Sequence, residues 1–255
     1  MQTAKHQRSQ RHKSLAALTA GGVYFLLPAP AHAMHISEGI LSSPWAVLWF
    51  ALSAPFVLWG LRQIKTRSRI QPQYKPFVAL VGAAVFIISC LPVPVPVAGT
   101  CSHPVGTGLA AILVGPGPTV VLASVALTFQ ALFLAHGGLT TLGANIFSMG
   151  VAGAFIGYAI FRVARGLGAN FLVAAFLAGL LADWAAYAAT AFILTGALHQ
   201  TGQFLAMAKV ILVAFVPTQV PLAVLEGVIS AMAYRFVIQR RPLLLHADMK
   251  AGGAV

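Results

Sequence analysis

The sequence predicts an all-α membrane protein of about seven transmembrane helices that follow a cleaved signal peptide. Apolar residues make up 59% of the 255-residue chain and charged residues only 8%, whereas soluble domains carry roughly a quarter charged residues. Long apolar runs alternate with short basic clusters, and a membrane span needs about 20 mainly apolar residues. Basic clusters between apolar runs are typical of cytoplasmic membrane loops. The net charge of +12 therefore does not indicate a nucleic-acid partner.

Residues 1–33 have the layout of a secretory signal peptide. A basic start without acidic residues precedes an apolar run over residues 15–27, and Ala31 and Ala33 occupy the two positions that a signal peptidase reads. Cleavage after Ala33 would leave a mature chain that begins Met34-His35. If the signal stays uncleaved, Met34 has no free amine.

Seven apolar segments follow, and we expect each to be helical. Residues 104–114 are too few to span alone, so we expect a short or tilted helix packed inside the bundle. The last segment contains Pro217 and Pro221, where we expect it to bend. Residues 62–75 form a basic loop between the first two helices. The segments are 44–61, 76–91, 104–114, 119–135, 142–163, 170–194 and 204–237.

Charge predicts the topology. With Met34 outside and seven crossings, the basic clusters at 62–75, 162–165 and 235–241 all fall in the cytoplasm, as the positive-inside rule requires. Residues 242–255 are then a cytoplasmic tail, and we expect the membrane to be a bacterial inner membrane. A non-spanning segment 104–114 would break the rule for Arg162 and Arg165. The same topology places His35, His103 and His136 together on the periplasmic side.

The mature start is a candidate metal chelate. A free terminal amine, the amide nitrogen of residue 35 and the His35 imidazole can close fused rings around one ion. A planar nitrogen set suits Ni(II) or Cu(II) and can be adapted to Co(II). A lone histidine there would be incidental, but the same topology puts His103 and His136 on its side of the membrane. The chain has no G-x-x-x-x-G-K-[ST] phosphate loop, so it does not hydrolyse ATP by that route.

Three stretches, at residues 34–39, 101–109 and 136–145, closely resemble the CbiM/NikM family. These proteins are the substrate-capture membrane components of energy-coupling factor (ECF) transporters, a class of ABC transporter, for cobalt and nickel. The similarity covers residues 34–241 and is closest to the cobalt-type CbiM. Ser37 and Val105 depart from a methionine and a threonine that are common in the family. Further matching residues lie at 147–149, 219–222 and 226–227.

The resemblance implies a square-planar site whose four nitrogens come from the Met34 amine, the His35 amide and imidazole, and the His103 imidazole. It places His136 around these ligands, with a helix-end cap as the alternative. It also implies ECF ATPase subunits, a coupling transmembrane subunit, a small accessory membrane subunit, and a link to cobalamin biosynthesis. The other residues that we expect around the ligands are Glu38, Ser102 and Asn145.

Some residues keep more than one interpretation. Cys101 is an axial thiolate, a disulfide partner of Cys90 or a spectator thiol. Glu38 balances the charge of the ion, or is a solvated or helix-capping residue. Asp183 and Glu226 lie inside apolar runs, where ionisable groups are costly and usually paired, so we expect structural roles or docking to the transport partner.

The sequence therefore predicts a non-enzymatic membrane component, without a cofactor, that binds Co(II), or Ni(II) as second choice, as transported substrate. One rival is a membrane metalloenzyme whose metal keeps an open position. Another is a receptor or assembly subunit that binds no metal and retains its signal.

Overall fold

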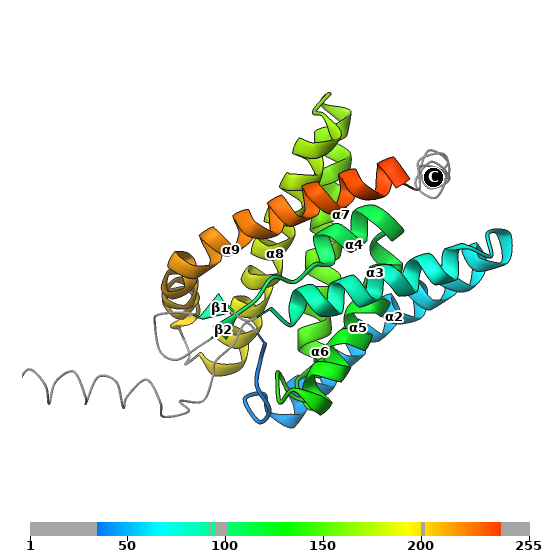
Figure 1. Cartoon of the computed structure of the whole chain (residues 1–255). Helices are drawn as coiled ribbons and strands as arrows, with labels where there is room; N and C mark the ends of the chain where they lie inside the picture. The colour runs from blue at the N-terminus through cyan, green and yellow to red at the C-terminus, as the bar shows by residue number, and fades with distance from the viewer. Residues whose placement is uncertain (1–34, 92, 95–100, 200–201, 241–255) are drawn as a thin grey trace, which may run out of the picture.

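The structure is a computed structural model that describes residues 35–91, 93–94, 101–199 and 202–240. The expected signal peptide, Met34 and the tail 242–255 lie outside these residues. The described part is helical apart from one short strand pair and loops (Figure 1). Its elements are α2 (Ser43–Ile70), α3 (Tyr74–Ser89), β1 (Val93–Pro94), β2 (Cys101–Ser102), α4 (Thr107–Val114), α5 (Pro116–Phe133), α6 (Leu142–Asn145), η1 (Ile146–Ala152), α7 (Gly153–Gly166), α8 (Phe171–Leu198) and α9 (Phe204–Arg240).

Five helical segments are long and apolar enough to cross a membrane: α2, α5, α8, α9 and the continuous stretch Leu142–Gly166 that contains α6, η1 and α7. Helix α3 is apolar but shorter, at 16 residues. Many large apolar side chains on these helices are exposed, which is the state expected of surfaces that face lipid. The chain is a multi-pass membrane protein.

The short third segment crosses the bundle as an extended stretch followed by α4. His103 lies beside His35 at one end, and the carbonyl of Val114 accepts hydrogen bonds from Arg67 and Tyr74 at the other. All eight residues of α4 are buried, so the expectation of a short helix inside the bundle is confirmed. A segment buried in protein can be irregular within a membrane because neighbouring helices satisfy its backbone.

The prediction that the first helix ends at residue 61 and is followed by a loop over residues 62–75 was wrong. The helix α2 continues through the basic residues to Ile70, and only residues 71–73 separate it from α3. Arg, Lys and Gln are good helix formers, so the helix persists after its apolar run ends. The helix α9 is continuous through Pro217 and Pro221, and this continuity does not contradict the bend expected there.

One end of the bundle is basic. In Figure 1 the α2–α3 turn lies at the right, the α7–α8 turn at the top and the end of α9 at the upper right, whereas α6 lies at the bottom and β1 and β2 at the lower left. Nine of the ten Lys and Arg residues within the described ranges belong to the first end, and Lys209 near the start of α9 is the tenth. This separation is the one that the positive-inside rule requires.

Small residues allow close helix contacts at the centre of the bundle. A Cβ added to Gly157 of α7 would lie 3.0 Å from both Gly108 of α4 and Ala182 of α8. Contacts of this kind pack helices in a membrane, where lipid removes the hydrophobic drive. Gly157, Gly108 and Ala182 therefore allow α7, α4 and α8 to pack closely at this point.

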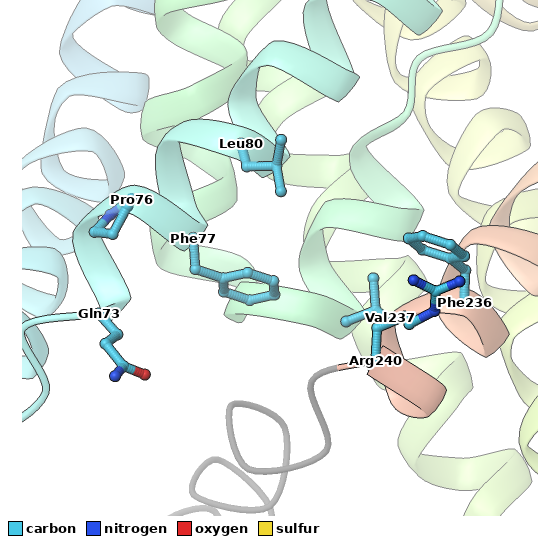
Figure 2. Close-up of a pocket in the computed structure, with 7 residues that line it drawn as sticks. All are labelled: Gln73, Pro76, Phe77, Leu80, Phe236, Val237 and Arg240. Atoms are coloured by element: carbon cyan, nitrogen blue, oxygen red, sulfur yellow. The ribbon is translucent and has the colours of Figure 1, made fainter.

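A groove of about 730 Å³ opens between α3 and α9 at the basic end. Figure 2 shows Phe77 and Leu80 of α3 on one side and Phe236, Val237 and Arg240 of α9 on the other. Among the described residues, no histidine lines this groove. The candidate ligands His35 and His103 lie at the opposite end of α3, near Ser89.

Candidate metal centre

Three histidines from separate parts of the chain meet at the non-basic end of the bundle. His35 precedes α2, His103 follows β2, and His136 follows α5. One ring nitrogen of each lies within 4.8 Å of those of the other two. The ring centroid of His35 lies 4.7 Å from that of His103 and 4.6 Å from that of His136. Within the described ranges no carboxylate joins this cluster.

The His35–His103 pair has the spacing of two ligands on one ion. His103 Nε2 lies 3.0 Å from His35 Nδ1, and His103 Nδ1 lies 3.0 Å from the carbonyl oxygen of Pro104. Because a carbonyl only accepts, Nδ1 of His103 carries the hydrogen and Nε2 presents its lone pair to His35. Two nitrogens bound about 2 Å from one ion, at adjacent corners of a square, lie about 2.8 Å apart.

Burial keeps these imidazoles neutral. His35 and His103 are only 3% and 2% exposed. Burial lowers the pKa of His103 to about 4. Burial, followed by repulsion from His103 and His136, lowers the pKa of His35 well below its ordinary value. Burial also lowers the pKa of His136. Since a metal binds the neutral imidazole, these rings have at neutral pH the net charge that a metal ligand needs.

The backbone after His35 is held by the start of the fifth membrane segment. Ile36 N–H donates to Oδ1 of Asn145 at 2.8 Å, and Nδ2 of Asn145 donates to the Ile36 carbonyl at 3.1 Å. The Thr141 hydroxyl donates to the same carbonyl at 2.6 Å. The sequence prediction included Asn145 but not Thr141. Directly after Asn145 the helix widens into η1, and π-helical turns inside α-helices are frequent at functional sites.

Glu38 lies outside the histidine cluster. Its carboxylate accepts from the N–H of Thr140 at 3.1 and 3.3 Å, and hydrogen bonds led by the Thr140 side chain lower its pKa. The α2 N-cap is Ser42, so Glu38 does not cap that helix. Glu38 instead ties the segment after His35 to the loop after His136.

Gln130 is a site residue that the sequence did not reveal. Its Nε2 donates to the carbonyl and hydroxyl of Ser89 at 3.2 and 2.8 Å. The Gln130 side chain raises the pKa of His35 against the effect of burial, as an acceptor facing an imidazole does. Neither Gln130 Oε1 nor His35 Nε2 has a hydrogen-bond partner within the described ranges. They line a small crevice together with His103 and Met149.

The side chain of His136 contacts the other two imidazoles. Its ring stands at 85° to that of His35, and its Nε2 is buried without a hydrogen-bond partner among the described residues. Its backbone N–H donates to the carbonyl of Gln130. The backbone of His136 therefore caps the end of α5, as one interpretation expected, whereas its ring belongs to the histidine cluster.

Glu226 also reaches the loop of His103, from far along the chain. Its carboxylate accepts the N–H groups of Val105 and Gly106 at 2.7 and 2.9 Å, and the side chain is 1% exposed. It is therefore not available for docking to a partner. The side chains of Ser102 and Cys101 and the expected ligand Met34 lie outside the described residues, as does any Cys90–Cys101 disulfide.

Comparison with known proteins gives a consistent match. Residues 35–244 match the CbiM family, described as the cobalt uptake substrate-specific transmembrane region. The chain is 58% identical over 220 residues to the cobalt transport protein CbiM of Geobacter sulfurreducens, covering 86% of this chain and 64% of that protein. It is 56% identical over 212 residues to that of Sorangium cellulosum, covering 83% of this chain and 94% of that protein.

Two solved structures share the fold. One is a crystal structure of a transition metal transporter, with a TM-score of 0.71, 26% identity, and coverage of 85% of this chain and 99% of that chain. The other is a truncated transition metal transporter, with a TM-score of 0.70, 28% identity, and coverage of 80% and 98%. The resemblance to CbiM noted in the sequence is confirmed.

Proposed function

The chain belongs to the CbiM family of cobalt uptake substrate-specific transmembrane regions, and from that premise we propose that it captures Co(II) as transported substrate. Ni(II) is the second candidate, because the same planar nitrogen set suits it. The proposed ligands are the amine of Met34, the amide nitrogen and Nδ1 of His35, and Nε2 of His103. The single observation that carries the proposal is the 3.0 Å approach of His103 Nε2 to His35 Nδ1.

His35 needs no large movement to become a ligand. An ion bound at Nδ1 requires the ring proton to reside on Nε2, which is buried near Gln130. Gln130 Oε1 would accept that proton, because its amide is already oriented by Ser89. Ligating histidines usually donate their second nitrogen in this way, which fixes the tautomer and the ring orientation.

The site is proposed to face the periplasm, with the basic end of the bundle in the cytoplasm. The chain carries no phosphate-loop motif, so ATP hydrolysis would come from ECF ATPase subunits acting through a coupling transmembrane subunit, with a small accessory membrane subunit beside them. If the ion is cobalt, the uptake would supply cobalamin biosynthesis. The curated relatives compared above are named as transport proteins, which supports a transport component rather than an enzyme.

The test is elemental analysis of the purified chain, after intact mass has shown where it begins. We expect one Co or Ni per chain that starts at Met34, and none in the His103→Ala variant. Metal that remains in His103→Ala would contradict the ligand set. A correctly processed chain that binds neither ion would overturn the proposal, and an intact signal would remove the amine on which it depends.

A further inference from the structure

The metal ligand His103 is joined to the basic end of the bundle by α4, and both ends of this helix are held by charged side chains. At its start, Glu226 accepts from Val105 and Gly106. At its end, the Val114 carbonyl accepts from Arg67 at 3.1 Å and from the Tyr74 hydroxyl at 2.9 Å. An anion at the start and a cation at the end both suit the helix dipole.

Glu226 lies where burying an ionisable side chain costs free energy. It lies on α9 inside a segment long and apolar enough to span the membrane, and its side chain is 1% exposed. Ionisable groups at such depth are costly and are usually functional. Its oxygens are satisfied by two backbone N–H groups that lie 121 and 120 residues away in sequence. General stability would be served at less cost by an apolar residue, so the contact needs a specific reason.

The reason lies in the short distance along the chain from Glu226's partners to the metal ligand. Only Pro104 separates His103 from Val105, and its ring fixes the backbone φ angle. The imidazole of His103 is also bonded to the Pro104 carbonyl. Gly106 has a φ of +73° and turns the chain into α4, a conformation that glycine adopts without strain. A displacement of Val105 is therefore transmitted to the His103 ring.

We propose that Glu226 is a positioning residue for the metal ligand, because its carboxylate fixes Val105 and Gly106 and so holds His103 Nε2 at ligand distance from His35. The inference rests on the proposed function and deepens it. It assigns to α9 direct control over the geometry of the nitrogen site. A movement of α9 that withdraws Glu226 would loosen the fourth nitrogen without touching the chelate at the mature N-terminus.

The chain offers a matched control in Asp183 of α8. This carboxylate is fully buried and interacts electrostatically with Glu226, but neither oxygen has a hydrogen-bond partner within the described ranges. Asp183→Asn and Glu226→Gln make the same chemical change in the same surroundings. Only Glu226→Gln replaces one of the two acceptors of the loop with an NH₂ donor.

The experiment measures Ni(II) and Cu(II) binding to the full chain, purified in detergent and verified to begin at Met34. Titration gives the affinity, and visible absorption reports the ligand field of the planar site. For Glu226→Gln we expect a roughly 10- to 100-fold weaker affinity, the range typical of lost outer partners, with a shifted absorption band. For Asp183→Asn we expect the wild-type affinity and band.

Wild-type affinity and absorption in Glu226→Gln would overturn the inference, as would an equal loss in Asp183→Asn. If Glu226→Gln does not accumulate as folded protein, Glu226→Asp replaces it, since the charge remains while the shorter side chain cannot reach both N–H groups. Wild-type binding in Glu226→Asp would then overturn the inference. Failure of the proposed function is distinct, because the wild-type chain itself would then bind neither ion.

Discussion

The side-chain amide of Asn145 is hydrogen-bonded to both backbone groups of Ile36, 109 residues earlier in the chain. This pairing fixes the residue that follows His35, so it also limits the movement of the proposed chelate. Ile36 is 1% exposed and packs against Leu41, Ala144 and Ile193. The proposed ligand His35 is therefore held in place through Ile36, whose backbone is hydrogen-bonded to Asn145 and whose side chain is buried in an apolar cluster.

Asn145→Ala should weaken metal binding by about 10- to 100-fold, as is typical when outer partners of metal ligands are removed. The Ile36 backbone would lose both hydrogen bonds with this residue and keep only the one from Thr141. Titration of the purified chain with Ni(II) measures the effect. Ser124→Ala is the control, since its hydroxyl bonds only to the Val120 carbonyl of its own helix. Equal affinities in the two variants would show that Asn145 does not support the site.

His103, His136 and His199 should differ in their contributions to metal binding. His103→Ala should abolish stoichiometric metal binding, because it removes a proposed ligand. His136→Ala should weaken binding by about tenfold, because its ring packs on both proposed ligands in the manner of an outer partner. His199→Ala should have no effect, since its ring bonds to the carbonyls of Thr195 and Gly196. Elemental analysis of the three variants checks this order, which a loss of metal in His199→Ala would contradict.

Metal binding should weaken steeply as the pH falls below about 8, near the ordinary pKa of a terminal amine. Binding must release one proton from the amine and one from the amide, so the apparent affinity should fall by roughly 100-fold per pH unit there. The imidazoles should not set this range, because burial lowers the pKa of His103 to about 4. Metal titrations between pH 6 and 8 measure this slope. An affinity that stays constant down to about pH 6.5 and falls only below it would show instead that protonation of an ordinary histidine limits binding.

The same lowered pKa values affect the stability of the folded chain. An unfolded chain takes up protons on histidine near pH 6.5, whereas folded His103 does so only near pH 4. Protonation of His103 in the unfolded chain therefore lowers the free energy of unfolding progressively as the pH falls from 6.5 toward 4, and has no such effect above pH 6.5. Thermal unfolding in detergent without metal should show a midpoint that decreases over this interval. His103→Ala should show a smaller decrease.

For metal binding, the position of the terminal amine of Met34 should matter more than the identity of the Met34 side chain. Insertion of one alanine between Ala33 and Met34, with cleavage still after Ala33, would move the amine one residue from the chelate. We expect loss of stoichiometric binding, because the fused rings can no longer close. Met34→Leu keeps the amine in place and should bind normally. Intact mass must confirm both starting residues, and tight planar binding by the insertion variant would exclude the amine as a ligand.

Close helix packing should make Gly108 intolerant of larger residues. A Cβ there would lie 2.8 Å from the Ala178 carbonyl and 2.8 Å from the Ala182 side chain. Gly108→Val should therefore destabilise the chain by about 1–3 kcal/mol, as expected for overpacking. Gly166→Ala is the control, because a Cβ at that position meets nothing within 4 Å. Thermal unfolding of the two variants measures the difference, and equal midpoints would contradict the packing argument.

Composition and periodic apolar runs determined most of the architecture. A charged fraction of 8% and apolar runs near 20 residues long leave a membrane bundle as the stable solution. The basic clusters predicted which helix ends lie together, and the structure shows that separation. Helix ends were less predictable: α2 extends to Ile70 because good helix formers follow its apolar run. Local composition also gave no sign of η1, whose widened turn depends on its packing.

The histidines and Asn145 could be identified from the chain alone, because the short motifs that contain them resemble those of one family. The approach of His35 to His103, and the contacts of Gln130, Thr141 and Glu226 around them, became visible only in the folded protein. The physical reason is that hydrogen bonds between distant residues leave no periodic pattern in the chain. Glu226 was visible as a costly charge in an apolar run, but its partners, Val105 and Gly106, contribute only backbone N–H groups, which every residue except proline carries.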